Sequence, residues 1–154
     1  MLQIDDVDQR IIASLVADAR ASYAEIGARV SLSAPAVKRR VDRLRASGVI
    51  KGFTAVIDPT AVGWNTEAFV ELFCHGRTTP VQIAVATRRH PEVIGAYTVS
   101  GEADALVHLR AADIAHLEQA LERLRAEPFV TSTRSMIVLS RLVDSPSVAP
   151  PRPE

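Results

Sequence analysis

Three features of the sequence predict an α+β protein built in two successive parts. Before residue 48, apolar residues recur at helical spacing in three short segments. After residue 65 the pattern changes to strand, helix, strand, strand, helix, strand. Between them, Pro59 and Gly63 in "DPTAVGWN" interrupt both patterns and mark a linker. We therefore expect an N-terminal domain over residues 1–53, a linker over 54–64, a second domain over 65–143 and a disordered, proline-rich tail over 144–154.

The composition is that of a globular chain, with 47% hydrophobic and 23% charged residues among 154. No apolar run approaches the roughly 20 residues that a membrane span needs. The acidic start "MLQIDDVDQR" lacks the basic-then-apolar order of a signal peptide. The single cysteine, Cys74, excludes an internal disulfide and is typical of a reducing compartment. We expect a cytoplasmic protein with no membrane segment.

The first two helices are expected near the N-terminus. The first runs from about Asp6 to Asp18, and Asp5 or Asp6 can cap its start. Ser22 and Glu25 in "SYAE" have the spacing of a capping box, which predicts a second, short helix to about Arg29. The apolar residues that these helices bury are Val7, Ile11, Leu15 and Ile26.

A third helix follows the turn "VSLS". Ser33 is expected to cap it, and Pro35 fits its first turn, where no amide donor is needed. Gly48 is placed to end it. Its apolar stripe consists of Val37, Val41 and Leu44. A short helix, a tight turn and a second helix of this kind match the helix-turn-helix arrangement.

The third helix also gathers positive charge in a chain whose net charge is zero. From Lys38 to Lys51 there are six basic residues and one acid. At 100° per residue, Arg39 and Arg43 fall on the outer face, whereas Lys38 and Arg40 flank the apolar stripe. "GVIKGFTAVID" then continues as a strand pair or wing with Lys51 near its tip. A winged helix-turn-helix with a basic outer face is typical of a protein that binds double-stranded DNA.

The residues expected to contact DNA are those exposed on this helix and on the wing. They are Ser33, Ala34, Pro35, Lys38, Arg39, Arg40, Arg43 and Lys51. The small side chain of Ala34 lets the start of the helix approach base edges closely. The alternative is that "KRRVDRLR" is only a solvated helix face. The capped second helix, the Ser33 cap and the following wing favour DNA binding over that alternative.

The same segment resembles the Lrp/AsnC family of prokaryotic transcription regulators. The residues that carry the resemblance are Leu32-Ser33, Val37, Arg40-Val41, Leu44, Gly48-Val49-Ile50, Gly52-Phe53, Asp58-Pro59 and Gly63. Three positions depart from the usual family pattern. Ser31 stands where glycine is usual, Gly27 where alanine is usual, and Arg45 replaces a common glutamate. The resemblance implies a sequence-specific DNA-binding regulator that acts at the nucleoid, although these departures leave its target sequence open.

The second part of the chain is expected to form a βαββαβ, ferredoxin-like domain. The strands are "TEAFVELFC", "EVIGAYTVSG", "DALVHLRA" and "VTSTRSMIVLSRLV". One helix is expected from Pro80 to about Arg89, and Asp113 should cap the other. The apolar stripe of that second helix consists of Ile114, Leu117, Leu121 and Leu124. This order resembles the ligand-sensing and oligomerisation domain of the same family.

Two helices can cover only one face of a four-stranded sheet. "AFVELF" and "MIVL" nevertheless carry apolar residues at consecutive positions, so both faces of the sheet require burial. The uncovered face should therefore meet a copy of itself in a two-fold dimer. The resemblance implies the same dimer, and further association of dimers into tetramers or octamers.

The resemblance also implies a small effector, commonly an amino acid, bound between dimers at the turn "SGEAD". The matching residues are Tyr97, Val99, Gly101, Glu102, Asp104, Thr133 and Ser135. Gly101 lets a ligand approach the backbone, and Glu102 or Asp104 can accept hydrogen bonds from an ammonium group. The alternative is structural: Gly101 makes a hairpin turn, Asp104 caps it and the hydroxyls line a sheet edge.

Other functions find less support in the residues. The four histidines lack metal-site spacing, and no phosphate loop or nucleophile elbow is present, so we expect no enzyme, metal or cofactor. Glu102 and Asp104 could form a carboxylate pair, but such residues at a turn are more often solvated. An architectural, DNA-compacting protein with weak sequence preference is the alternative to a regulator. An amino-acid sensor without DNA binding is disfavoured by the basic helix.

Overall fold

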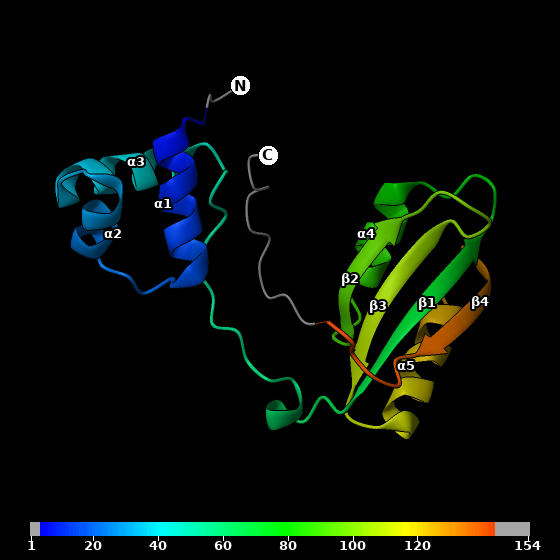
Figure 1. Ribbon diagram of the computed structural model, residues 1–154. Helices are drawn as coiled ribbons and strands as arrows, with labels where there is room; N and C mark the ends of the chain where they lie inside the picture. Colours follow the sequence, from blue (N-terminus) through cyan, green and yellow to red (C-terminus); the bar gives the residue numbers. More distant parts are fainter. Residues whose placement is uncertain (1–3, 144–154) are drawn as a thin grey trace. The chain divides into compact units, whose positions relative to one another are not determined.

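The computed structural model describes residues 4–143, which form two units that meet in sequence at Val56 and Ile57 (Figure 1). The first unit contains three helices, and the second contains a four-stranded sheet with two helices. The tail expected over residues 144–154 lies outside the described residues. Within residues 4–143, no helix has both the length and the apolar character needed to cross a membrane.

The first unit consists of α1 (Asp6–Ala17), α2 (Tyr23–Val30) and α3 (Ala34–Ala46). The three helices bury one side each against a shared core, as the apolar periodicity predicts. The buried side chains of this core are Ile11, Leu15, Ile26, Val30, Val37 and Val41. Leu44, the last residue of the predicted stripe of α3, is also fully buried.

The predicted capping residues stand at the helix starts. Asp5 caps α1 in a capping box with Asp8, and Ser22 caps α2 in a capping box with Glu25. Ser33 occupies the N-cap position of α3, but its side chain makes no capping hydrogen bond. That part of the prediction is wrong, and the start of α3 relies instead on Pro35, which lacks the amide proton that a cap would satisfy.

The expected strand pair after α3 is absent. Residues 49–57 contain no strand, although Gly48 ends the helix region with a φ of 76° as predicted. Phe53 and Val56 in this segment are largely exposed. A strand is stabilised by hydrogen bonds to a neighbour, and no other segment of the described chain pairs with this one. A short 3-10 helix, η1 (Thr60–Val62), follows before the second unit.

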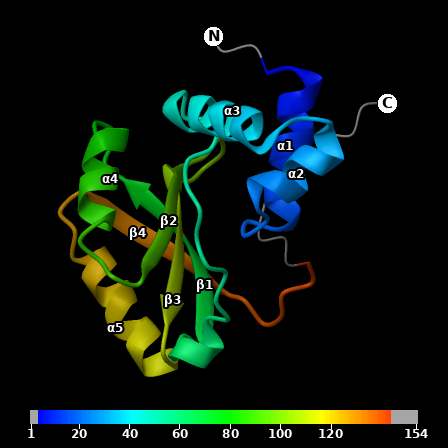
Figure 2. The ribbon, with the colours of Figure 1, turned by 90° about the vertical axis from the view of Figure 1, so that its left-hand side faces the viewer.

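The second unit has the predicted βαββαβ order. Its elements are β1 (Thr66–Cys74), α4 (Pro80–Thr87), β2 (Val93–Thr98), β3 (Ala105–Ala111), α5 (Ile114–Arg125) and β4 (Val130–Ile137). The strands pair antiparallel in the order β2-β3-β1-β4. Both helices cover the same face of the sheet, as Figures 1 and 2 show. The α+β, ferredoxin-like prediction is confirmed.

The two faces of the sheet differ in burial. The face toward α4 and α5 holds the core, formed by Val70, Leu72, Val107 and Leu109 together with Ile83, Leu117 and Leu124. Side chains on the opposite face alternate with these along each strand. They include Phe69, which pairs with His108 and Met136, and also Leu106, and all four are only partly covered. Apolar surface is therefore left on the face that carries no helix.

Two details of this unit correct the sequence prediction. The last strand ends at Ile137 rather than continuing to Val143, because its partner β1 begins at Thr66 and Ile137 already pairs with Ala68. Leu139 and Leu142 beyond it are almost fully exposed. Ile114 is also more than half exposed, because it lies at the first turn of α5, whereas Leu117 and Leu124 are buried.

Candidate DNA-binding and effector sites

The turn between α2 and α3 brings the two helices close together. Ser31 adopts a left-handed conformation, with φ 57° and ψ 43°, at the point where glycine is usual. The amide of Leu32 donates to the carbonyl oxygen of Gly27 over 2.9 Å. A Cβ atom at position 27 would overlap the carbonyl oxygen of Leu32, so glycine fits this close approach. Two of the three departures from the family pattern, Gly27 and Ser31, therefore meet at one tight turn.

Four of the five basic residues of α3 form two groups. Lys38 and Arg39 lie on the exposed side; Lys38 is paired with Asp42 over 2.7 Å, and Arg39 makes no ion pair within the described part of the chain. Arg40 and Arg43 instead reach the start of α1. The sequence analysis placed Arg43 on the outer face of α3, and Arg43 is exposed there, but its guanidinium is paired with Asp8.

Two carboxylates of α1 hold Arg40 and Arg43. One terminal nitrogen of Arg40 donates to Asp5 over 2.7 Å and to Asp8 over 2.8 Å. A terminal nitrogen of Arg43 donates to the other oxygen of Asp8 over 2.5 Å. Asp8 is fully buried, whereas Asp5 is exposed. The hydrogen bond from Arg40, followed by that from the Asp8 amide, lowers the pKa of Asp5 below its ordinary value.

A cavity of about 380 Å³ lies on this side of α3. Its wall consists of Leu32, Ala36, Arg39, Arg40 and Arg43. Three arginine side chains therefore line one hollow beside the small side chain of Ala36. The predicted contacts Ser33, Ala34 and Pro35 stand at the helix start next to it, with Ser33 and Pro35 exposed. Lys51 is exposed in the irregular segment after α3.

The turn between β2 and β3 is held by Asp104. Its carboxylate accepts a hydrogen bond from the Cys74 amide over 2.7 Å, and its own amide donates to the carbonyl of Leu72 over 3.0 Å. Gly101 has a φ of 139°, and no atom would contact a Cβ placed there. Glu102 is exposed and lies 3.7 Å from Arg134. Asp104 thus supports the turn, and the space around Gly101 is open.

The other predicted effector residues do not converge within one chain. Tyr97 pairs with Leu106 and lies on the face without helices. Thr133 and Ser135 pair with Leu72 and Val70, so they lie on the helix-covered face. Thr133 accepts a hydrogen bond from Arg125 of α5 over 3.0 Å. Since β2 and β4 are opposite edges of the sheet, Tyr97 and Ser135 are about 14 Å apart. Val99 lies in the turn itself.

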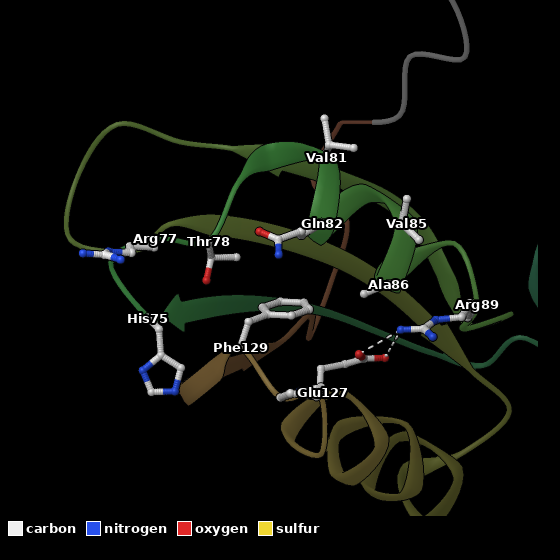
Figure 3. Close-up of a pocket in the computed structure, with 11 residues that line it drawn as sticks. His75, Arg77, Thr78, Val81, Gln82, Val85, Ala86, Arg89, Glu127 and Phe129 are labelled. Carbon is white, nitrogen blue, oxygen red and sulfur yellow. Dashed lines mark hydrogen bonds and ion pairs between the residues drawn. The ribbon is translucent and has the colours of Figure 1, made fainter.

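A groove that the sequence analysis did not anticipate lies between α4 and the segment before β4 (Figure 3). Its volume is about 580 Å³, and Val81, Val85, Ala86 and Phe129 make much of its wall apolar. At one end, Arg89 donates to Glu127 over 3.0 Å. Figure 3 shows Arg77 directed away from the Phe129 ring. The groove depends on side chains from α4 and from residues 127–129, which no motif links in sequence.

Two clusters of histidine and carboxylate occur elsewhere in the second unit. Glu92 is nearly fully buried and accepts hydrogen bonds from His116 over 2.8 Å and Arg123 over 2.5 Å. Burial raises the pKa of Glu92, but these hydrogen bonds outweigh it, so that the pKa lies below its ordinary value. Glu67 contacts His108 and Arg141. Among residues 4–143, no three His, Cys, Asp or Glu side chains group as metal ligands.

Comparison with known proteins identifies relatives of both units. Residues 4–45 match the model of the AsnC-type helix-turn-helix domain, and residues 67–148 match that of the Lrp/AsnC ligand binding domain. The HTH-type transcriptional regulator Rv2324 of Mycobacterium tuberculosis is 57% identical over 144 residues, which cover 94% of this chain and 97% of that protein. LrpA of the same organism is 36% identical over 89% of this chain and 91% of its own.

Solved structures agree with these matches. The feast or famine regulatory protein Rv3291c of M. tuberculosis, complexed with L-methionine, superposes with a TM-score of 0.88 at 34% identity. The alignment covers 96% of this chain and all of that one. Escherichia coli AsnC, at 22% identity and a TM-score of 0.90, shares the fold over 97% of this chain.

Proposed function

The chain belongs to the Lrp/AsnC family of transcriptional regulators, and we propose that it reads DNA through α3 and that a small effector, an amino acid, controls its assembly or its DNA affinity. The observation that carries the DNA-binding part is the cavity on α3 that three arginine side chains line. Cationic groups beside small residues at a helix start suit phosphate and base edges. We further propose that the protein acts on nucleoid DNA in the cytoplasm; its relatives are transcriptional regulators and not enzymes.

The experiment that tests DNA reading is selection of preferred duplexes from a random library, followed by affinity measurements at one stated salt concentration. A regulator should bind its selected site at least about 10³-fold more tightly than a scrambled duplex. A ratio below about tenfold would instead support the architectural, DNA-compacting alternative. Selected sites should contain inverted half-sites spaced by whole turns, about 10 base pairs each.

We propose a homodimer formed through the face of the sheet that carries no helix. Partly exposed apolar side chains on that face, among them Leu106 and Met136, support it. Burial of such a patch against its own copy satisfies a two-fold axis without further elements. Association of dimers into tetramers or octamers is proposed from the family alone.

The effector is proposed to bind between chains at the Gly101 turn. The open space at Gly101 supports a site there, and the crystallised relative Rv3291c was complexed with L-methionine. Tyr97 and Ser135 lie at opposite edges of one sheet, which supports a site completed by a second chain. An effector that bridges chains can change their association and hence the spacing of the α3 helices.

Calorimetry with each of the twenty amino acids, L-methionine first, tests the effector proposal. A binder should change DNA affinity by about 5- to 150-fold, and DNA should change its affinity by the same factor. Gly101→Val should abolish binding, whereas Gly63→Val is the matched control: Gly63 also has positive φ and open surroundings but lies outside the turn. If no amino acid binds at millimolar concentration, Gly101 is only a turn residue.

A further inference from the structure

Asp8 of α1 is a buried carboxylate that contacts two arginines of α3, the helix proposed to read DNA. It lies in the first turn of α1 and has no exposed surface. Its two oxygens accept from Arg40 over 2.8 Å and from Arg43 over 2.5 Å. A buried carboxylate is costly unless ionised partners surround it, so both guanidinium groups are held firmly at this position.

These ion pairs restrict the rotamers of Arg40 and Arg43 before any ligand binds. A free arginine side chain samples many rotamers, and ordering it on binding opposes association. Arg40 is tied to Asp5 and Asp8, and Arg43 is tied to Asp8. The ordering therefore occurs when the protein folds.

The tied guanidinium groups keep donors for a ligand. Each guanidinium carries five N–H donors. Arg40 uses one terminal nitrogen for its two contacts, and Arg43 uses one hydrogen bond. Both side chains line the 380 Å³ cavity together with Arg39, and neither Asp5 nor Asp8 lines it.

The charges around the cavity leave one positive charge in excess. Three arginine side chains line the cavity, and the carboxylates of Asp5 and Asp8, which pair with Arg40, do not line it. A single phosphodiester of a DNA strand carries one negative charge and fits this excess. Free carboxylate or phosphate oxygens are also the acceptors that a guanidinium fork matches in shape.

We propose that Asp8 is a positioning residue, which holds Arg40 and Arg43 so that they form, with Arg39, a preorganised site for one phosphodiester of the DNA backbone. The proposal rests on the DNA-binding function proposed above. For removal of Asp8, the proposal predicts a change in DNA affinity opposite to the one that charge alone predicts. Removing an acidic residue near DNA should strengthen binding by reducing repulsion. Loss of positioning should weaken it.

Three aspartates of the same segment allow a matched experiment. Asp8→Asn keeps the shape but places an amide donor against an arginine donor. Asp5→Asn removes one partner of Arg40 and keeps the helix cap, since asparagine caps as well as aspartate. Asp6→Asn is the control, because Asp6 is exposed and makes no ion pair within residues 4–143. All three variants raise the net charge by one.

The readout is affinity for the duplex selected by the wild-type protein and for its scrambled version, at one salt concentration. Asp8→Asn should lose about tenfold in specific affinity, and Asp5→Asn about threefold. Asp6→Asn should bind both duplexes as tightly as wild type or up to about twofold more tightly. Circular dichroism and thermal unfolding establish that each variant is folded.

A second arm locates the phosphate. Neutral methylphosphonates are placed one at a time along the selected duplex, and one position in each half-site should weaken wild-type binding by about tenfold. At that position Arg43→Ala and Asp8→Asn should show no further loss, because the contact is already absent. If Asp8→Asn fails to fold, Asp5→Asn and Arg43→Ala against the same duplexes test the proposal.

The outcomes separate the inference from the proposed function. If the wild-type protein selects no sequence, the proposed function fails. If it does, but Asp8→Asn binds as tightly as Asp6→Asn, the positioning role of Asp8 is wrong. Additive losses for Arg43→Ala and the methylphosphonate at every position would also overturn the phosphate site.

Discussion

Ser31 shows how one backbone angle shapes the helix-turn-helix. Its φ of 57° is left-handed, which costs a residue with a side chain about 1–2 kcal/mol relative to glycine. The turn nevertheless requires it, because the chain must leave α2 and begin α3 within three residues, Ser31 to Ser33. Serine is therefore tolerated here at a cost in stability.

Ser31→Gly should consequently stabilise the protein by about 0.5–1 kcal/mol, after the added flexibility of the unfolded chain offsets part of the gain. Urea denaturation measures the change. Ser47→Gly is the control, since Ser47 has a right-handed φ of −84° and bonds to Leu44. That variant should lose stability by a similar amount. If Ser31→Gly also lowered the stability, the left-handed strain at Ser31 would be contradicted.

Arg39 and Arg43 should separate DNA binding from folding. Arg39→Ala should weaken DNA binding and lower the slope of log affinity against log salt by about one unit, with stability unchanged within about 0.5 kcal/mol. Arg43→Ala should weaken binding and also cost about 1–2 kcal/mol, because Asp8 stays buried with one partner fewer. Salt titrations and urea denaturation of both variants measure this. Identical stabilities would show that Asp8 does not depend on Arg43.

At the scale of elements, helices were easier to infer than strands at their ends. A helix forms its hydrogen bonds within itself, so caps such as Ser22 and stripes such as Val37 and Val41 predict it locally. A strand needs a partner. β4 stops at Ile137 where β1 begins, and the expected wing over residues 49–57 finds no partner in the described chain.

Glu92 joins the start of β2 to α5 through His116 and Arg123, and its removal should loosen that packing. Glu92→Gln should cost about 2 kcal/mol at pH 7, since it weakens two charge-assisted hydrogen bonds of a buried group. Glu122→Gln, in an exposed pair with Arg125, should cost less than about 0.5 kcal/mol. Thermal and urea unfolding at one protein concentration compare the two. Equal losses would contradict a role for burial.

The stabilisation by Glu92 should also depend on pH. The pKa of Glu92 is lowered in the folded protein, so its stabilisation is complete above the ordinary pKa of 4.5. That stabilisation is lost as the pH falls through the folded pKa, because the unfolded chain then binds the proton first. The stability difference between wild type and Glu92→Gln should therefore shrink below pH 4.5. A difference that stays constant down to pH 3 would contradict it.

At the scale of the whole molecule, the sheet face without helices should decide assembly. Met136 lies on that face opposite Phe69 and is nearly half exposed. Met136→Glu would bury a charge in a dimer interface and should produce monomers in sedimentation experiments. Val85→Glu is the control, because Val85 is an exposed apolar residue on α4, at the groove of Figure 3. A dimer that survives Met136→Glu would place the interface elsewhere.

The sequence alone determined the order of the elements, the capping box of Ser22 with Glu25 and the basic character of α3. These features depend on neighbours within about four residues, such as Ser22 with Glu25, or on the alternation of burial along a strand. The family resemblance rested on the same local pattern, and both domain matches agree with it. The match to the helix-turn-helix domain model likewise disfavours the alternative that the basic face of α3 is only a solvated surface.

The tertiary structure decided which charges are free and which residues share a surface. The helical spacing placed Arg43 on the outer face, but only the structure shows that Asp8, 35 residues earlier, pairs with it. Tyr97 and Ser135 were grouped by resemblance, but the strand order places them at opposite edges of the sheet. Such outcomes depend on how helices cross and strands pair. Those contacts join distant segments, so no local spacing records them.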